Sequence, residues 1–307
     1  MVTLSVSSTS RSLAASLQID VPTNATIADV KAAVAKTTKV HHSRLKVTLK
    51  GQKRSLEDEA RLSTILGDDF KNGELDVLDM GPQIAWKTVF LIEYLGPIIF
   101  HPIYFHFSKY IYGAPVQHST MQKFAYGFMM LHFIKRELET LFVHRFSHGT
   151  MPRSNLYKNC MHYHFGAGFV LGYNLYQPLY SATSPTIVNG LRSNKNFLWA
   201  CAAIMAFSEL SNLHTHWTLR NLRPEGSRKR GIPYGYGFSF LSCPNYFFEI
   251  IAWITFSVMT HSGSSYLFTA IAITQMAVWA AKKHKVYKKE FGNSYPKGRY
   301  ALMPFIL

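Results

Sequence analysis

The stretch of residues 238–260 (FSFLSCPNYFFEIIAWITFSVMT) constrains the fold more than any other part of the chain. It is long and apolar enough to cross a bilayer, since a spanning helix needs about 20 mostly apolar residues. Asn245 and Glu249 lie four residues apart within it, so a helix would place them on one face with Tyr246 beside them. A carboxylate at membrane depth is costly and marks a functional site by default. The alternative is a buried carboxylate that only ties two helices together.

The composition indicates a membrane protein. Charged residues make up 16% and aromatic residues 14% of the 307-residue chain. The formal net charge is +16, but Lys and Arg cluster beside apolar segments. This pattern favours membrane lipids and phosphorylated cofactors as partners, and no nucleic acid. The three cysteines form no CxxC pair, so we expect neither a disulfide framework nor a zinc ribbon. Residues 1–20 lack the features of a signal peptide, so the first apolar span is expected to target the chain to the membrane.

Residues 1–80 predict a separate α+β domain. Alternating apolar residues indicate strands over 2–8, 15–21, 45–49 and 74–79. Thr26 precedes an amphipathic stretch, and Asp29 follows three residues later, which resembles a capping box at the start of a helix. This order of elements resembles a ubiquitin-like (β-grasp) domain, which we interpret as a cytosolic cap or docking module. No diglycine follows it, so conjugation is not its expected role.

Residues 81–307 predict an α-helical multi-pass membrane domain with six or seven transmembrane helices. The expected spans are 86–106, 119–141, 161–180, 197–216, 238–260 and 264–281, and a seventh helix could lie near 102–118 or in the tail. The loops at 142–160 and 217–237 and the tail from 282 together carry fifteen Lys and Arg residues, against three in the other loops. The positive-inside rule therefore predicts that both termini are cytosolic.

Two charged clusters could carry chemistry. One holds Lys135, Arg136, Glu137 and Glu139 near the end of the second span, where an i,i+4 ion pair between Lys135 and Glu139 is the simplest structural explanation. The other is SNLHTHWTLRNLRPEGSRKRG at 211–231, whose Arg, His and Asn side chains suit phosphate groups. A basic loop that only contacts lipid headgroups is the alternative for this second cluster. No GxGxxG follows a strand, which argues against a Rossmann site.

Histidine pairs raise the question of a metal. His144 and His148 are spaced H-x3-H, and two H-x-H pairs follow at 162/164 and 214/216. Membrane di-iron hydroxylases and desaturases bind metal through such clusters, but they also carry H-x-x-H-H boxes, which are absent from this sequence. We therefore expect no metal site.

Four motifs together resemble the very-long-chain trans-2-enoyl-CoA reductases of the steroid 5α-reductase family. They are KRELETLFVHRFSHGTMP at 135–152, LRNLRPEGS at 219–227, SCPNYFFE at 242–249 and YPKGRYALMPFIL at 295–307. The first is specific to the enoyl-CoA branch, whereas the second and the C-terminal Pro-Phe are shared with the steroid reductases. The resemblance covers the membrane region, and an N-terminal ubiquitin-like domain also fits it.

The resemblance implies a reaction in which NADPH delivers hydride to the β-carbon of an α,β-unsaturated thioester and the α-carbon is then protonated. It implies Tyr246 as the proton donor and Lys135 as its partner. A neighbouring ammonium would favour the phenolate and bring a phenol of ordinary pKa about 10 nearer to the working range. A fixed donor or cation at the thioester oxygen would lower the barrier. The second and fifth spans would have to touch for these two residues to meet.

For NADPH, the resemblance implies binding by residues at the end of the fourth span, in the fifth span and in the tail: Asn212, Arg220, Arg223, Asn245, Glu249, His284 and Tyr287. His216 is a departure, because the steroid reductases carry an acid there. The preference for NADPH over NADH rests on the resemblance alone.

The expected role is the last reduction of each fatty-acid elongation cycle, in the endoplasmic-reticulum membrane. The expected partners are a long-chain enoyl-CoA substrate and, by analogy, the condensing enzyme, ketoreductase and dehydratase of the cycle. Two rivals stay open. One is a steroid or polyprenol enone reductase on the same scaffold, and the other is a non-catalytic membrane adaptor that displays the ubiquitin-like domain.

Overall fold

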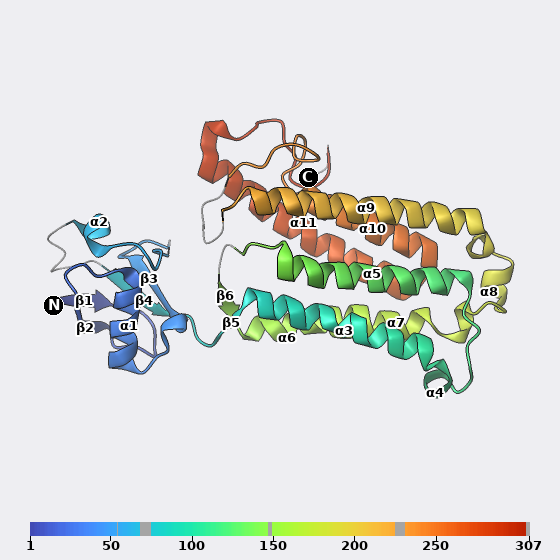
Figure 1. Cartoon of the computed structure of the whole chain (residues 1–307), viewed down its shortest axis with the longest axis horizontal. Coiled ribbons are helices and arrows are strands. Elements are labelled where there is room, and N and C mark those ends of the chain that lie inside the picture. The colour runs from blue at the N-terminus through green and yellow to red at the C-terminus, as the bar shows by residue number, and fades with distance from the viewer. Residues whose placement is uncertain (54, 68–74, 147–148, 225–230, 305–307) are drawn as a thin grey trace. The chain divides into compact units, whose positions relative to one another are not determined.

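The structure is a computed structural model that describes residues 1–53, 55–67, 75–146, 149–224 and 231–304. The chain divides into two compact units (Figure 1). The first comprises residues 1–84 with 150–154, and the second comprises 85–149 with 155–307.

The N-terminal unit is built on a four-stranded mixed sheet in the order β2-β1-β4-β3. Strand β1 (Val2–Ser7) pairs antiparallel with β2 (Ser16–Val21) and parallel with β4 (Leu75–Asp79), which pairs antiparallel with β3 (Leu45–Leu49). Alternate side chains of β1 and β2 are buried, as a period of two requires. The predicted strands are confirmed. Two short helices, η1 (His42–Arg44) and α2 (Leu62–Leu66), complete the unit together with α1 (Ile27–Thr38).

Helix α1 begins where the capping box was predicted. The Thr26 backbone N–H donates to Asp29 Oδ2 (2.8 Å), and the Asp29 N–H donates to Thr26 Oγ1 (3.4 Å). Val30 and Val34 are fully buried against the sheet residues of the same core. Cap and apolar face together fix where the helix starts and which side it buries.

The second unit is a helical bundle in which the long helices lie roughly alongside one another (Figure 1). They are α3 (Trp86–His106), α5 (Thr120–Phe142), α9 (Lys195–Asn221), α10 (Pro244–Thr260), α11 (Gly263–Phe291) and a continuous helical stretch made of α6 (Ser154–Cys160), η3 (Met161–Val170) and α7 (Leu171–Leu175). Shorter elements of this unit are α4 (Ser108–Tyr112), η4 (Pro178–Tyr180), α8 (Pro185–Val188), η5 (Leu191–Ser193) and η6 (Gly292–Ser294). The paired strands β5 (Gln83–Ala85) and β6 (Thr150–Pro152) belong, apart from Ala85, to the first unit. Each predicted span therefore has a helix at or near its position.

The helix predicted over 238–260 starts later than expected. Helix α10 begins at Pro244, whose fixed φ and missing N–H suit the first helical position. Gly235 and Gly237 precede it with φ of 93° and 73°. Residues 240–242 instead exchange backbone hydrogen bonds with Tyr300 (2.8 and 2.9 Å). The 17 residues of α10 make a helix of about 26 Å, somewhat shorter than the hydrocarbon core.

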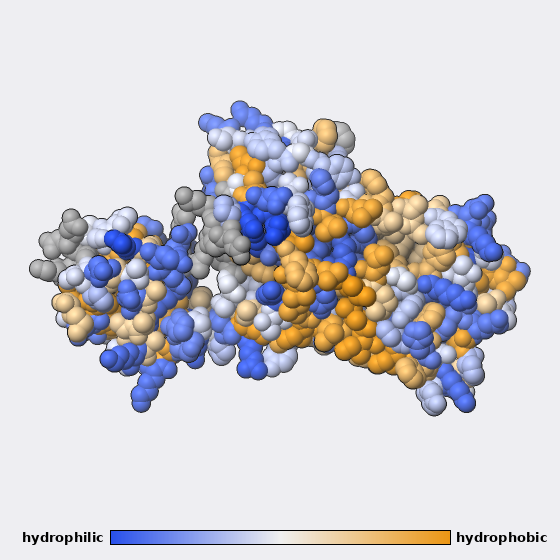
Figure 2. All heavy atoms as spheres, viewed as in Figure 1, coloured by the Kyte–Doolittle hydropathy of each residue, from blue (hydrophilic) through white to orange (hydrophobic). Residues whose placement is uncertain are grey.

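Two helices of the described chain are long and apolar enough to cross a membrane, Trp86–His106 and Gly263–Ser294. Helix α5 departs from that pattern because it carries the charged cluster at 135–139, so the total of six or seven spans remains a prediction. On the face shown in Figure 2, hydrophobic residues gather over the middle of the helical unit, with more hydrophilic residues towards its ends. Exposed apolar side chains on α3 and α5 include Leu95, Ile99, Ile103, Leu131, Ile134 and Leu138.

Candidate active site

A cavity of about 540 Å³ lies in the helical unit among α5, α9, α10 and α11. The ends that meet there are the C-terminal parts of α5, α9 and α11 and the N-terminal part of α10. Five of the nine predicted site residues line it, namely Arg220, Arg223, Asn245, Tyr246 and Tyr287. The other four, Lys135, Asn212, Glu249 and His284, are not among the lining residues.

The first turns of α10 bring Asn245, Tyr246 and Glu249 together as the spacing predicted. Asn212 of α9 holds them: its Nδ2 donates to the Asn245 backbone carbonyl (2.9 Å) and to Glu249 Oε2 (3.4 Å). Lys135 of α5 in turn donates to Asn212 Oδ1 (2.5 Å). Three helices are thus joined by one line of hydrogen bonds directly behind the cavity wall.

Asn245 also presents an unused acceptor. Its side chain is almost fully buried, and its Oδ1 atom has no hydrogen-bond partner among the described residues. A buried carbonyl oxygen without a hydrogen bond costs free energy, so a ligand that donates a hydrogen bond to Asn245 Oδ1 would remove that cost on binding.

Tyr246 lines the cavity, and its hydroxyl has no hydrogen-bond partner within the described chain. The cation beside it is Lys283, whose Nζ lies 6.0 Å from the centre of the Tyr246 ring. Lys135 is engaged elsewhere, with Nζ 2.9 Å from Glu209 Oε2 and 3.3 Å from Glu139 Oε1. Helices α5 and α10 do pack together, through Phe128 and Phe256 (ring centres 5.4 Å apart). The proposed partnership of Lys135 with Tyr246 remains a prediction, and Lys283 was missed.

Buried charges surround this site on the α5 side. Arg136 donates to Glu139 Oε2 (2.7 Å) and to the Tyr94 hydroxyl (2.8 Å). Glu209 accepts a hydrogen bond from His132 Nδ1 (2.7 Å). Charges buried in this way are tolerated only when each has close partners of opposite sign. The predicted Lys135–Glu139 ion pair is confirmed, as one contact of a larger network.

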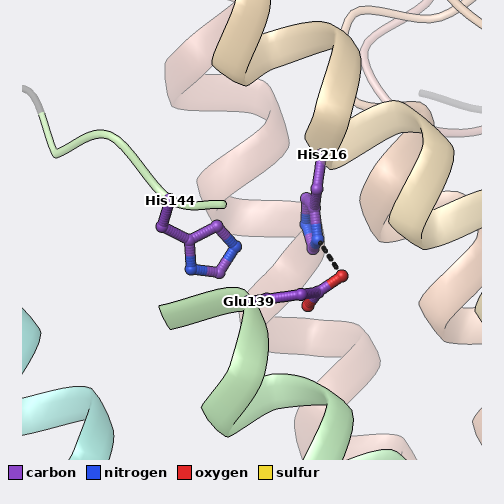
Figure 3. Close-up of side chains that lie close together, drawn as sticks. All are labelled: Glu139, His144 and His216. Carbon is purple, nitrogen blue, oxygen red and sulfur yellow. Dashed lines mark hydrogen bonds and ion pairs between the residues drawn. The ribbon is translucent and has the colours of Figure 1, made fainter. Parts of the chain in front are cut away.

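Glu139, His144 and His216 lie close enough to hold a metal ion, with one ligand atom from each within 4.8 Å of the others (Figure 3). Yet the oxygens of Glu139 already accept hydrogen bonds from His216 Nδ1 (3.0 Å) and Arg136, and Lys135 adds a second nearby cation. A divalent ion would have to displace these donors against two positive charges. This arrangement favours a hydrogen-bonded network over a metal site, and His148 lies outside the described residues.

His144 itself follows the end of α5 and lines the cavity. Burial, and then the charge of Arg136, lowers the pKa of His144 to about 2, so its imidazole is neutral at physiological pH. Its Nδ1 atom is buried and has no partner among the described residues. A neutral ring of this kind can exchange a hydrogen bond with a bound ligand.

The cavity is strongly electropositive. Six cationic side chains and no acidic one appear among its described lining residues: Arg136, Arg145, Arg220, Arg223, Lys282 and Lys283. Arg145 and Arg223 clamp the segment after α5 to the end of α9, because each donates to a backbone carbonyl at the other's position. Guanidinium groups gathered in one cavity suit the phosphate groups of a nucleotide.

The tail residues separate into two roles. Tyr287 lines the cavity, whereas His284 Nδ1 bonds to Ser242 Oγ (2.5 Å), which also contacts the Tyr295 hydroxyl (2.6 Å). His284 therefore fixes the entry to α10 against the tail. Lysines 282 and 283 could have been singled out only as part of a basic run, because the sequence alone does not say which of its lysines face inward.

Comparison with known proteins assigns the chain to a family. The family model described as 3-oxo-5-alpha-steroid 4-dehydrogenase matches residues 149–307. A Dictyostelium discoideum protein named very-long-chain enoyl-CoA reductase is 40% identical over 92% of both chains. A human protein named trans-2,3-enoyl-CoA reductase-like is 34% identical over 92% of this chain and 78% of its own length. A Schizosaccharomyces pombe protein whose name describes a candidate enoyl reductase is 47% identical over 75% of both chains.

Proposed function

The chain belongs to the 3-oxo-5-alpha-steroid 4-dehydrogenase family and, within it, groups with the enoyl-CoA reductases. On this premise, we propose that it reduces long-chain trans-2-enoyl-CoA to saturated acyl-CoA with NADPH. The observation that carries the proposal is the electropositive cavity in which the unpartnered Tyr246 hydroxyl and the unpaired Asn245 Oδ1 occur together.

NADPH fits the residues of this cavity. Arg220 and Arg223 offer the donors that its phosphates need, with Lys282 nearby. Asn245 Oδ1 offers a buried acceptor for a carboxamide N–H₂, and Asn212 and Glu249 hold the Asn245 segment in place. Tyr287 also lines the cavity, and His284, outside the lining, bonds to Ser242 just before the start of α10. When bound, the cofactor supplies the hydride.

Tyr246 serves as the proton donor in this proposal. Hydride addition at C3 moves the electron pair of the double bond towards the thioester oxygen, and the resulting enolate takes the phenolic proton at C2. The phenolate left behind is stabilised by the positive charge of Lys283. Lys135 contributes by holding Asn212, and through it the start of α10, in position.

The family and the two apolar helices support a membrane protein. We place it in the endoplasmic reticulum with both termini cytosolic, where the condensing enzyme, ketoreductase and dehydratase of elongation would supply its substrate. The mixed sheet and helix of residues 1–80 support a ubiquitin-like cytosolic domain followed by the catalytic domain, 81–307.

The substrate class can be tested directly against the steroid rival. Purified protein should oxidise NADPH when given a long-chain trans-2-enoyl-CoA and remain at background with a steroid or polyprenol enone, because the relatives that it matches over most of its length are named very-long-chain enoyl-CoA reductases. The decrease in NADPH fluorescence over time measures the rate of both reactions. Oxidation with the enone alone would move the chain to the steroid branch, and oxidation with neither would favour the adaptor.

A further inference from the structure

A second cavity, of about 530 Å³, lies along the side of the bundle between α5 and α9. Apart from Lys135 and Glu209, its described lining is apolar: Phe124, Gly127, Phe128, Leu131, Ala202, Met205, Ala206, Leu210, Leu213 and Met259. These twelve residues define what we call the lateral groove.

The lateral groove runs lengthwise along both helices. Its α5 residues recur at helical spacing from Phe124 to Lys135, a distance of about 16 Å at the rise of an α-helix, and its α9 residues recur from Ala202 to Leu213. A side chain at Gly127 would meet nothing within 4 Å, so this glycine leaves the groove open. Leu131 and Leu210 are 57% and 66% exposed, so the groove also opens to the surroundings of the bundle.

The polar end of the groove adjoins the first cavity. Lys135 lines the groove and donates to Asn212, and Asn212 donates to the carbonyl of Asn245, which lines the first cavity. Only the side chains of Lys135 and Asn212 therefore lie in the line of contacts from the polar end of the groove to Asn245 in the wall of the first cavity. The groove runs from there towards the N-terminal halves of α5 and α9, away from the cationic residues.

We infer that the lateral groove binds the acyl chain of the thioester substrate, an inference that rests on the proposed function. An acyl-CoA joins a reactive thioester to an apolar chain, and the proposed function places the thioester at Tyr246 in the first cavity, next to the polar end of the apolar groove. A phospholipid tail would match the groove alone, whereas the acyl chain of a thioester that reacts at Tyr246 would also account for the closeness of the groove to the first cavity. The far end, at Phe124 and Ala202, then limits the chain length that the groove holds.

Filling the groove tests this assignment. Gly127→Leu and Ala206→Phe place side chains into the groove, and the first also replaces glycine by a better helix former. We expect kcat/KM for a very-long-chain trans-2-enoyl-CoA to fall at least about tenfold, the scale on which apolar pockets discriminate. The kcat/KM for the shorter substrate trans-2-octenoyl-CoA should stay within about twofold of the wild-type value. The matched control is Ala203→Phe, exposed on the same helix outside the groove. Equal losses for both substrates, or none, would overturn the inference.

A binding measurement separates this inference from the reaction itself. An acyl-CoA with a diazirine near the end of its chain should label residues 124–135 and 202–213 on irradiation, as located by mass spectrometry, and excess unlabelled acyl-CoA should suppress the labelling. Labelling elsewhere, or labelling that excess acyl-CoA does not suppress, would overturn the groove assignment. Because this readout needs no turnover, groove labelling by a protein that reduces no enoyl-CoA would refute only the proposed function.

Discussion

Tyr246→Phe is expected to lower kcat for trans-2-enoyl-CoA reduction by about 10²–10⁴-fold, the usual contribution of a positioned acid. The substitution removes one hydroxyl from the cavity wall and leaves the aromatic ring that packs near Trp279. Because that hydroxyl bonds to no other described residue, its loss leaves no protein group unsatisfied. NADPH affinity and thermal stability should therefore stay close to wild type while turnover falls.

The control for this variant is Tyr266→Phe. Tyr266 lies near the start of α11, and its hydroxyl bonds to His261 Nδ1 (3.0 Å), outside the cavity lining. Single-turnover rates measured by stopped flow for both variants separate the chemical step from product release. A Tyr246→Phe enzyme that turns over at the wild-type rate would assign protonation to another group or to water.

Lys135→Met is expected to destabilise the protein by about 3 kcal/mol, because removing one partner leaves buried charge uncompensated. Lys135 bridges Glu139 and Glu209, and both carboxylates are almost completely buried. The remaining partners, Arg136, His132 and His216, offset only part of that loss. Thermal unfolding in detergent, followed by circular dichroism, measures the effect.

A second substitution shows whether the effect comes from charge. Lys135→Met combined with Glu209→Gln removes one carboxylate along with the lysine, so we expect part of the lost stability to return. Lys123→Met serves as the control, because Lys123 is exposed on the same helix. If Lys135→Met kept wild-type stability but lost turnover, Lys135 would act in catalysis and not mainly in holding the bundle together.

This network also explains how α5 can carry a charged cluster inside a bundle with an apolar exterior. Arg136 and Glu139 point inward and satisfy one another, while Leu131, Ile134 and Leu138 of the same helix are exposed. The helix therefore presents apolar residues outward although its composition is mixed. A test based on composition alone cannot separate these two faces.

Local patterns in the sequence were sufficient to predict most of the elements. Period-two alternation, the Thr26 capping box and long apolar runs each depend on neighbours within a few residues, and the corresponding strands and helices are present. The start of α10 was predicted six residues too early because Phe240 and Ser242 exchange backbone hydrogen bonds with Tyr300, far along the chain, instead of extending the helix. The π-helical geometry of η3 is likewise not encoded in a pattern that periodicity reveals.

The site could be predicted as a set of residues more readily than as a set of contacts. Asn245, Tyr246 and Glu249 share the first turns of α10, so spacing alone groups them. Which lysine stands next to Tyr246 depends on how α5, α10 and α11 pack, and the structure puts Lys283 there while Lys135 contacts two carboxylates. The lateral groove has the same origin, since it exists only where the faces of α5 and α9 meet.

The central claim is most directly tested by tracing hydrogen in the product. Purified protein is given a long-chain trans-2-enoyl-CoA and NADPH deuterated at the transferable position of the nicotinamide, and the product is analysed by mass spectrometry and NMR. The account predicts saturated acyl-CoA with deuterium at C3, and deuterium at C2 when the reaction is instead run in D₂O with unlabelled NADPH. Deuterium from the cofactor at C2, or an unreduced substrate, would contradict it.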